Sequence, residues 1–436
     1  MPKKEKTVYI LGAGASRAVG LPLQSQLLPS IFSFEPPVFD EDKDFMELII
    51  NDRQEAVMNF YPEFVTQREM LADFIIDAFS SETFHIDYRN ACNSGDQKLA
   101  LSLVEQINVT LEDLFTLFDK VALGREHFQT YTTQEMEKLH AALKKCIIFV
   151  LAYQAALREQ SPPIYSRLAK KIIDHRLEAS AKDDVLAIIT MNWDSVLEQE
   201  LYQQCEKYNI GKTGRTPKIY PDLCFYDYSF RSTENRIIST HIKAKGHRNV
   251  KLLKLHGSTN WLACPFCGRV FVDYNSDISI LEFSTKRPCP YCSQEIKDGD
   301  GNDEHAPQLR SMLITPTFLK DLNNLHLKNI WHNAFIDISE AEHLVFIGYS
   351  FPDADFEMRC LLKKAVKINT KIDIVLHNLD NPQHYQSNFV EKGFTKEEIK
   401  HLMNKLNLPH FRYSSFFNKD RLMFHYEGIE AYLELM

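Results

Sequence analysis

Apolar residues change their spacing along the chain, and this change divides the chain into regions. Thr7 to Leu11 is a short β-type run that ends in a glycine-containing loop, and a helical segment near Leu23 to Ile31 follows it. Residues 34 to 44 are rich in Pro and Asp, which is typical of a loop. From about Phe45 to Ala181 glycine almost vanishes and apolar residues recur at helical intervals, so we expect a helical module here. The clearest predicted helices are Glu69 to Phe79, Gln97 to Ile107, Leu111 to Leu123, Thr133 to Leu157 and Pro163 to Ala179.

The β-type signal returns after this module. Val185 to Thr190 is a continuous apolar run of the kind found in strands buried on both faces of a parallel sheet. Several later runs resemble it and are followed by helical patterns, and this alternation predicts an α/β fold with a doubly wound parallel sheet. The later strands are predicted at Leu252 to Leu255, Met312 to Ile314, His343 to Ile347 and Ile372 to Leu376, and the helices at Ser195 to Lys207, Asp355 to Lys367 and Lys396 to Leu406.

Four of the nine cysteines form two Cys-x-x-Cys pairs, Cys264 with Cys267 and, after 21 residues, Cys289 with Cys292. Two thiolate pairs suit a tetrahedral zinc ion, and in a reducing compartment this spacing favours metal over disulfides. Because all four expected ligands are cysteines, no coordination position is left open. We therefore expect the zinc to be structural.

These patterns predict three parts. Residues 1–44 and 181–436 are expected to form the α/β domain, residues 45–180 a helical insertion module, and residues 259–300 a zinc-knuckle subdomain within the α/β domain. The chain of 436 residues is 44% hydrophobic and 25% charged, which is close to the average for soluble globular proteins. The aromatic-rich tail after Pro409 is expected to pack on the main domain.

Charge and hydropathy restrict the expected partners. The net charge of −9 argues against nucleic acid or an anionic membrane as the main ligand, because phosphate binding requires clustered Lys and Arg. No apolar run after MPKKEK is long enough for a secretory signal, and none approaches the roughly 20 residues that span a bilayer. We therefore expect a cytoplasmic protein that binds no membrane and makes no direct contact with nucleic acid.

A glycine loop follows the first predicted strand, in the order Gly12-Ala13-Gly14-Ala15-Ser16. Glycine lets the backbone approach a diphosphate closely, and the N-terminus of the next helix favours an anion. However, Arg17 stands where the usual dinucleotide fingerprint has its third glycine, and no acidic residue ends a second strand about 20 positions later. An ordinary dehydrogenase is therefore not indicated, and a plain tight turn would explain the loop equally well.

Polar residues also follow four later strands, where ligands bind in open α/β sheets. Each has a structural alternative: the polar residues of the first and third motifs could cap the following helix, the histidine of the second could be a structural one, and the fourth could be an ordinary strand exit. The four motifs are Thr190-Met-Asn192-Trp-Asp194, Leu255-His256-Gly257-Ser258, Gly348-Tyr349-Ser350-Phe-Pro-Asp353-Ala-Asp355 and Val375-Leu-His377-Asn378.

Taken in order, these motifs resemble the sirtuin family over about residues 5–30 and 183–380. The chain is more similar to the prokaryotic sirtuin-like branch used in antiphage defence than to the protein deacylases. The resemblance implies a Rossmann-like NAD-binding catalytic domain. It implies diphosphate contacts at Gly12, Ala13, Gly14 and Ser16, catalytic roles for His256 as base, Asn192 at the nicotinamide ribose and Asp194 at the carboxamide, and adenosine contacts at Gly348, Ser350 and Asn378.

The chain departs from the deacylases in two places. Deacylases carry G-I-P-D-F-R after the glycine loop, whereas this chain has Gly20-Leu-Pro22-Leu-Gln and lacks the Phe that shields the reaction centre from water. The F-G-E segment that clamps an acyl-lysine peptide has no clear match near Thr315. Water is therefore the expected acceptor, and we predict hydrolysis of NAD to nicotinamide and ADP-ribose. The alternatives are an NAD-dependent protein deacylase or ADP-ribosyltransferase, and a non-catalytic NAD-sensing zinc module.

An uncontrolled NAD hydrolase would be toxic, so we expect control by assembly or by a partner. The resemblance implies an abortive-infection effector that depletes NAD when activated. The expected partners are further copies of the chain in a homo-oligomer and an activating protein, either an ATPase or a nucleic-acid-sensing protein, with the helical module as the docking surface.

Overall fold

The computed structural model describes residues 5–36, 52–157, 163–213, 216–223, 228–231, 237–239, 247–274, 277–282, 287–297, 307–315, 324–392, 394–406 and 408–436. Contacts divide the chain into two units. The first unit comprises Met1–Val19, Pro162–Ser258 and Leu322–Met436, and the second comprises Gly20–Ser161 and Thr259–Asp321. The domain boundaries expected at residues 45, 180 and 259–300 stay predictions.

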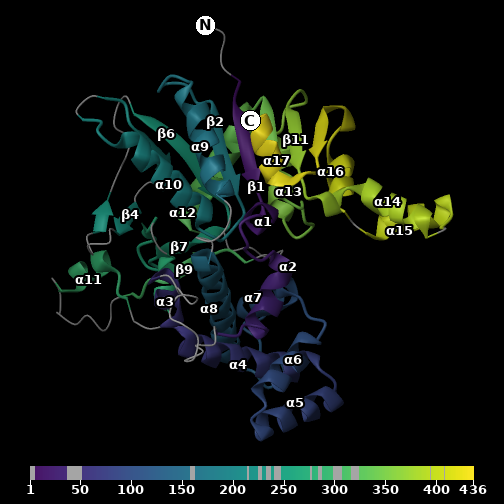
Figure 1. Ribbon diagram of the computed structural model, residues 1–436. Helices are drawn as coiled ribbons and strands as arrows, with labels where there is room; N and C mark the ends of the chain where they lie inside the picture. Colours follow the sequence, from purple (N-terminus) through teal and green to yellow (C-terminus); the bar gives the residue numbers. More distant parts are fainter. Residues whose placement is uncertain are drawn as a thin grey trace, which may run out of the picture. The chain divides into compact units, whose positions relative to one another are not determined.

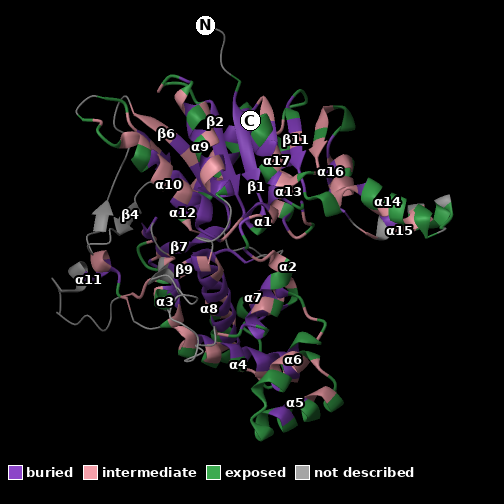
Figure 2. Cartoon of the chain, viewed as in Figure 1, coloured by how far each residue is buried: buried purple, intermediate pink, exposed green. Residues whose placement is uncertain are grey.

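A seven-stranded sheet organises the first unit, and its strand pairs are parallel (Figure 1). The central strands are apolar at nearly every position because both faces of the sheet are covered, and Figure 2 shows β1 and β2 as buried along their length. The doubly wound parallel sheet expected from the sequence is confirmed. The strand order is β12 (Leu422–His425), β11 (Lys371–Val375), β10 (His343–Ile347), β1 (Thr7–Leu11), β2 (Leu186–Thr190), β6 (Arg248–Lys254) and β3 (Ile219–Asp222).

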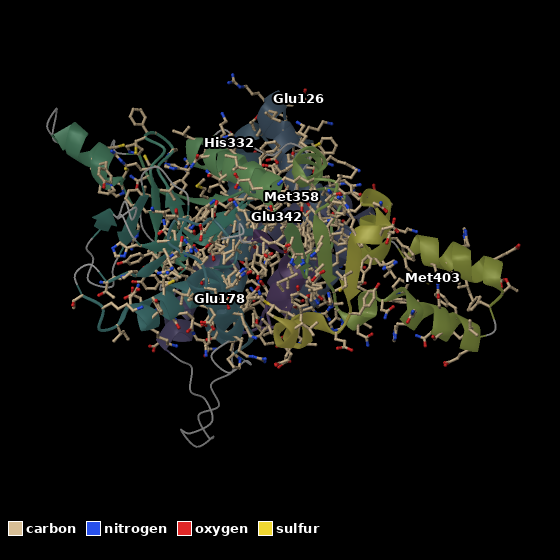
Figure 3. All side chains as sticks on the ribbon, turned by 90° about the horizontal axis from the view of Figure 1, so that it is seen from above. Glu126, Glu178, His332, Glu342, Met358 and Met403 are labelled. Carbon is tan, nitrogen blue, oxygen red and sulfur yellow. The ribbon has the colours of Figure 1, made fainter. Side chains whose placement is uncertain are left out.

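Helices connect these strands, and the aromatic tail packs with them in the same unit, as expected. Phe346 of β10 contacts the ring of Tyr413 in the tail, with ring centroids 5.1 Å apart. Met403 is buried in α15, beside α14 (Figure 3). The helices of the first unit are α1 (Ala13–Arg17), α9 (Ile164–Leu177), α10 (Val196–Asn209), α12 (Leu325–Glu340), α13 (Phe356–Ala365), α14 (Pro382–Glu391), α15 (Lys396–Lys405), α16 (Pro409–Phe416) and α17 (Gly428–Leu435).

The strand order fixes where a ligand is expected. The chain passes from β1 to β2 on one side, and from β10 to β11 on the other side. The carboxyl ends of β1 and β10 therefore lie at the point where the connections diverge. Open parallel sheets bind their ligands in the crevice at this topological switch point.

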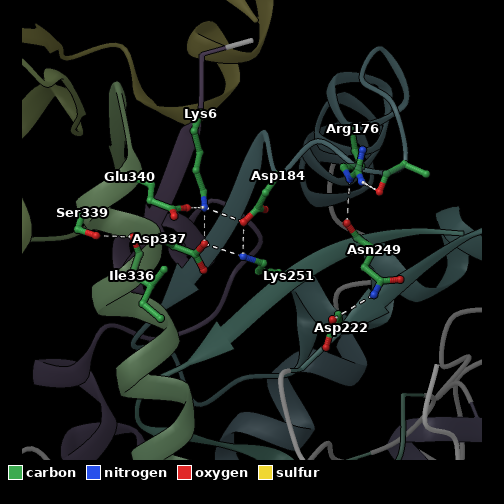
Figure 4. A network of polar contacts seen from close by, with 11 residues as sticks. Lys6, Arg176, Asp184, Asp222, Asn249, Lys251, Ile336, Asp337, Ser339 and Glu340 are labelled. Atoms are coloured by element: carbon green, nitrogen blue, oxygen red, sulfur yellow. Dashed lines mark hydrogen bonds and ion pairs between the residues drawn. The ribbon is translucent and has the colours of Figure 1, made fainter. Parts of the chain in front are cut away.

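An ionic network joins the opposite, amino-terminal edge of the same sheet (Figure 4). Lys6 Nζ lies 2.8 Å from Asp184, 2.6 Å from Asp337 and 2.8 Å from Glu340, and Lys251 Nζ lies 2.6 Å from Asp184 and 2.7 Å from Asp337. Lys6 directly precedes β1, and Lys251 lies within β6, where it is level with Ala187 near the start of β2. Asp184 precedes β2, and the other two carboxylates come from the end of α12. The network therefore fixes three strands and one helix at the edge farthest from the switch point.

The second unit is mainly helical and is built around α8 (Thr133–Leu157). The sequence predicted this helix at the same bounds but expected no run that could span a bilayer. By length and composition the helix could cross a membrane, but 72% of its most apolar window is buried (Figure 2). It is the core helix of the unit. The surrounding helices are α2 (Gln24–Phe32), α3 (Asp52–Met58), α4 (Tyr61–Phe79), α5 (Glu82–Ser94), α6 (Gln97–Glu105) and α7 (Leu111–Gly124).

The second unit also holds the cysteine module. Its strands β7 (Gly257–Ala263), β8 (Val270–Val272) and β9 (Arg310–Leu313) are neighbours in a separate sheet, and α11 (Pro290–Lys297) begins directly after Cys289 and contains Cys292. The strand predicted at Met312 to Ile314 was placed in the parallel sheet, and this placement is wrong. In the structure β9 lies beside β7 in the separate sheet, and Met312 and Leu313 are buried, so the apolar run reflects burial in the second unit.

Candidate active site

Three glycines meet at the switch point. The Gly14 amide donates to the Gly348 carbonyl at 2.8 Å, and the Gly12 amide donates to the Ile347 carbonyl at 3.0 Å. A Cβ atom on Gly12 would lie 2.6 Å from Tyr349 Cα, and one on Gly348, whose φ is 59°, would lie 2.0 Å from the Ala15 nitrogen. The glycine loop is therefore required by close packing of the two backbones. Its Gly12 and Gly14 amides both donate to backbone carbonyls at the exit of β10. The diphosphate contacts expected at this loop stay a prediction.

A hydrogen-bonded cluster joins the loop after β1 to the loop after β2. Ser16 donates its hydroxyl proton to Asp194 Oδ2 at 2.7 Å and accepts from Asn192 Nδ2 at 2.9 Å, and its oxygen lies 3.0 Å from the hydroxyl of Tyr165. Asn192 Nδ2 also donates to the Gly12 carbonyl at 3.0 Å. A hydroxyl has one proton to donate and two lone pairs, so this arrangement satisfies Ser16 completely. The sequence expected Ser16, Asn192 and Asp194 at one site, and the structure brings them together.

The cluster determines which atoms can meet a ligand. Both amide hydrogens of Asn192 are committed to Gly12 and Ser16, which leaves Oδ1 as its acceptor. Asp194 uses Oδ2 for Ser16 and Oδ1 for the amide of Val196 at 3.2 Å, at the start of α10. The sequence offered helix capping and ligand binding as alternatives for Asp194, and the contacts show that it organises the loop.

His256 leaves β6 beside this cluster. The Leu255 amide donates to the Thr190 carbonyl at 3.0 Å, so His256 and Asn192 emerge from neighbouring strands at nearly the same level. The His256 side chain is buried, and its Nε2 lies 3.8 Å from Asp355 Oδ1. The sequence-based expectation that the two loops share one edge therefore agrees with the geometry, and Asp355 is an addition to the set.

A buried ion pair supports the same two loops. Lys254 Nζ lies 2.7 Å from Glu198 Oε1, and both side chains are 1% exposed. Ser258 also donates to Glu198 Oε1 at 3.0 Å. Lys254 and Ser258 flank His256 in sequence, so Glu198 of α10 ties both sides of the histidine loop to the next element. The sequence analysis did not identify this pair, although a lysine at position 254, within an apolar run, could have indicated a buried partner.

The residues expected at the adenosine half lie on the next two strand ends. Gly348 donates its amide to the Val375 carbonyl at 2.9 Å, which keeps the β10 and β11 exits adjacent. Ser350 and Asn378 are exposed there. Arg412, which the sequence analysis missed, donates to the Ser350 carbonyl at 2.9 Å.

Two arginines bring positive charge to this part of the edge. Burial raises the pKa of Asp380, and the charges of Arg17 and Arg412 act against that rise. Both guanidinium groups therefore lie within electrostatic reach of the β11 exit. Arg17 stands where the dinucleotide fingerprint has its third glycine. The residue that argues against a dehydrogenase is therefore also a cation of the kind that can bind a phosphate.

The four predicted zinc ligands form one cluster in the second unit. Their Sγ atoms all lie within 4.8 Å of one another, and the Cys264–Cys292 and Cys267–Cys289 pairs are each separated by 3.8 Å. A tetrahedral zinc ion with Zn–S bonds of about 2.3 Å requires sulfur atoms about 3.8 Å apart. The donor set and its geometry therefore fit zinc, and the predicted four-cysteine module is confirmed as a cluster able to bind it.

Comparisons with known proteins find only a limited structural similarity. No family pattern and no curated protein matches the chain. Similar solved structures are sirtuins. One of these structures was solved to explain the substrate affinity of a sirtuin. It has a TM-score of 0.33 and 13% identity, and the match covers 99% of this chain and 91% of that chain. Sir2 with a p53 peptide and NAD+ has a TM-score of 0.31 and 11% identity, and Sir2 bound to an acetylated peptide has 0.33 and 12%, each covering 99% of this chain and 91% of the other. TM-scores this low carry no argument about ligands or activity, which must come from the residues of this chain.

Proposed function

We propose that this protein binds NAD at the carboxyl edge of its seven-stranded sheet and hydrolyses it to nicotinamide and ADP-ribose. The observation that carries the proposal is the cluster of Ser16, Asn192 and Asp194 at the topological switch point, with His256 emerging from the next strand. The order of the sequence motifs, which resembles that of the sirtuins, supports NAD as the ligand.

The chemistry follows from the groups that this edge offers. Cleavage of the nicotinamide–ribose bond develops positive charge on the ribose, as in glycoside hydrolysis. Asn192 Oδ1 is oriented to accept a hydrogen bond from a ribose hydroxyl, because its amide hydrogens are fixed on the other side. His256 acts as the general base that takes a proton from the attacking water. Arg17 and Arg412 supply the positive charge that a diphosphate needs.

Water is the proposed acceptor for a reason that lies in the sequence. The chain has Gly20-Leu-Pro22-Leu-Gln where deacylases carry the shielding Phe. This segment contains no aromatic side chain that could replace the shield, which supports water as the acceptor. A deacylase or an ADP-ribosyltransferase on the same scaffold remains the alternative, and an NAD-sensing zinc module is the non-catalytic one.

We further propose that zinc is the resident metal of the four-cysteine cluster. Bound there, it supplies no reaction chemistry, since four thiolates fill its coordination sphere. Its role is to hold β7, β8 and α11 together, because three of the four cysteines, Cys264, Cys289 and Cys292, lie in a small buried cluster with Leu262 and Phe271. A small core of this kind gains much of its stability from the metal.

The biological setting is proposed from the sequence resemblance. It supports a cytoplasmic antiphage effector that depletes NAD in abortive infection, acts as a homo-oligomer and is switched on by a partner, either an ATPase or a nucleic-acid-sensing protein. The helical module remains the proposed docking surface for that partner.

The proposal is tested by incubating the purified protein with NAD and separating the products by chromatography. We expect nicotinamide and ADP-ribose in equal amounts, and no cleavage by His256→Gln. The matched control is His332→Gln, because His332 is exposed on α12, outside the proposed site (Figure 3). Product formation that depends on an acetyl-lysine peptide would instead establish the deacylase, and tight NAD binding without any turnover, alone or with the proteins encoded beside it, would establish the sensor.

A further inference from the structure

Asp355 occupies the N-cap position of α13 and does not cap that helix. An aspartate at this position ordinarily accepts a hydrogen bond from a backbone amide of the first turn. Here the side chain makes no such bond, and it is 6% exposed. The carboxylate is therefore buried and directed elsewhere.

Its two oxygens face two side chains of the candidate site. Tyr349 donates its hydroxyl to Asp355 Oδ2 at 2.9 Å, and Asp355 Oδ1 lies 3.8 Å from His256 Nε2. Burial, together with the charge of Asp355, raises the pKa of Tyr349 well above its ordinary value, so the phenol remains a donor across the working pH range. The tyrosine thus holds one carboxylate oxygen while the other faces the histidine.

The loop that carries Asp355 is held in an unusual conformation. Gly348 and Phe351 both have positive φ, of 59° and 55°, and such a value is uncommon for a bulky residue. Phe351 is buried against the aromatic tail, with its ring centroid 5.0 Å from Tyr413 and 4.7 Å from Phe416. Backbone strain of this kind persists where the surroundings enforce it, and it concentrates at functional sites.

The contact also crosses the sheet. β10 and β6 are separated by β1 and β2, so their ends lie about 14 Å apart at the usual inter-strand spacing of about 4.8 Å. Asp355 and His256 nevertheless approach to 3.8 Å. The loop after β10 and the loop after β6 therefore meet over the carboxyl ends of β1 and β2, where the switch point lies.

We propose that Asp355 is the positioning residue of His256, and that Tyr349 in turn orients Asp355. The proposal rests on the proposed NAD hydrolysis. A carboxylate facing Nε2 favours the tautomer with the proton on that nitrogen, which leaves Nδ1 as the base. Nδ1 takes a proton from water, the water oxygen bonds to C1′ of the ribose, and the electrons of the C1′–nitrogen bond leave with neutral nicotinamide. The proton remains on His256, whose positive charge Asp355 stabilises.

Other charged groups of this edge are already engaged with one another. Lys254 on β6 is paired with Glu198 on α10, and Asp194, in the loop before α10, accepts hydrogen bonds from Ser16 and from the amide of Val196. We expect the pKa of His256 to respond to Asp355, whose carboxylate lies 3.8 Å from its Nε2. Nothing in the sequence separated this aspartate from an ordinary helix cap.

The test compares Asp355→Asn and Tyr349→Phe with the matched control Asp353→Asn. Asp353 is exposed in the same loop and pairs with Arg359. The readout is the titration of the His256 ring, followed by NMR on protein labelled with ¹³C-histidine, with the resonance identified by its loss in His256→Gln. An opposite charge at this distance raises a histidine pKa by about one to three units. We expect that rise to vanish in Asp355→Asn, to shrink in Tyr349→Phe and to persist in Asp353→Asn.

NAD cleavage provides the second readout. In Asp355→Asn the rate should fall by about 10²- to 10⁴-fold, the usual contribution of an acid–base group, and the acidic limb of its pH profile should move to lower pH. An unchanged His256 pKa, or a rate loss that is the same at every pH, would overturn the proposal. The titration needs no NAD, so a shifted pKa in a protein that never cleaves NAD would support the Asp355–His256 pair while refuting the hydrolase. Thermal unfolding of each variant verifies that it is folded. If Asp355→Asn does not fold, Tyr349→Phe provides the test in its place.

Discussion

Replacing Lys6 by methionine should strongly destabilise the protein. Lys6 Nζ lies 2.6 Å from Asp337, and the two side chains are 2% and 0% exposed (Figure 4). At this distance and an effective dielectric constant of about 20, the attraction is about 6 kcal/mol before desolvation. Breaking a buried pair by removing one partner costs about 3–5 kcal/mol, because the remaining charge stays buried. Asp184 and Glu340 are about half exposed, so the cost falls on Asp337. Lys251 Nζ, 2.7 Å from Asp337, still compensates part of that buried charge, so we expect a loss near the lower end of this range.

The measurement is urea unfolding at pH 7, with Lys98→Met as the control. Lys98 forms an ion pair with Glu35 at 3.0 Å, but both side chains are largely exposed, so water and salt screen it and at most about 1 kcal/mol is expected. A further variant, Lys6→Met with Asp337→Leu, should cost less than the two single changes combined, because it removes both buried charges. A loss below about 1 kcal/mol for Lys6→Met, or strict additivity in the double variant, would show that the network does not stabilise the fold.

Three further predictions concern other parts of the molecule. Gly348→Ala should be far more destabilising than Gly95→Ala in equilibrium unfolding, because both glycines have positive φ but only Gly348 has backbone atoms where a Cβ would be placed; equal losses would contradict this. The purified protein should contain one zinc ion per chain by elemental analysis, and Cys289→Ser should lower both the zinc content and the melting temperature; a full complement of zinc in that variant would exclude the site. Finally, the hydrogen bond from Lys6 lowers the pKa of Glu340 below its ordinary 4.5, and hydrogen bonds from Lys251 and Lys6 outweigh burial to lower that of Asp184 below 3.8. The stability that Glu340 and Asp184 contribute in this way is therefore present above about pH 4.5 and is lost as the pH falls through their pKa values in the folded protein. A melting temperature that stays constant from pH 5 to pH 2 would refute this.

The sequence predicted most accurately the strands that are buried on both faces of the sheet. The central strands have no polar alternation to confuse with a loop, so β10 was predicted at its observed bounds and β2 to within one residue. The edge strands were missed for the opposite reason. β3 contains Pro221, which is tolerated only because the strand lies at the edge of the sheet, and β12 is only half buried. The helix α5 was missed because few of its residues are apolar, and its ends are set by Ser81 and Gly95 instead.

The candidate site was predictable to the extent that it depends on strand ends. Parallel strands bring their carboxyl ends to one edge, so Ser16, Asn192 and His256 could be expected together. The contacts that specify their orientation could not be expected, because they depend on side-chain directions. Asp355 has the sequence signature of a helix cap, and only its missing cap bond and its approach to His256 distinguish it.

The division of the chain into two units has a consequence for experiments with fragments. The chain passes from one unit to the other four times, after Val19, Ser161, Ser258 and Asp321. No single cut can release either unit, and a recombinant segment of residues 20–161 would lack the cysteine cluster. One of these passages comes two residues after His256, at the start of a strand that leads directly to Cys264. A pull exerted on the cysteine module would reach the proposed catalytic base through seven residues of continuous backbone.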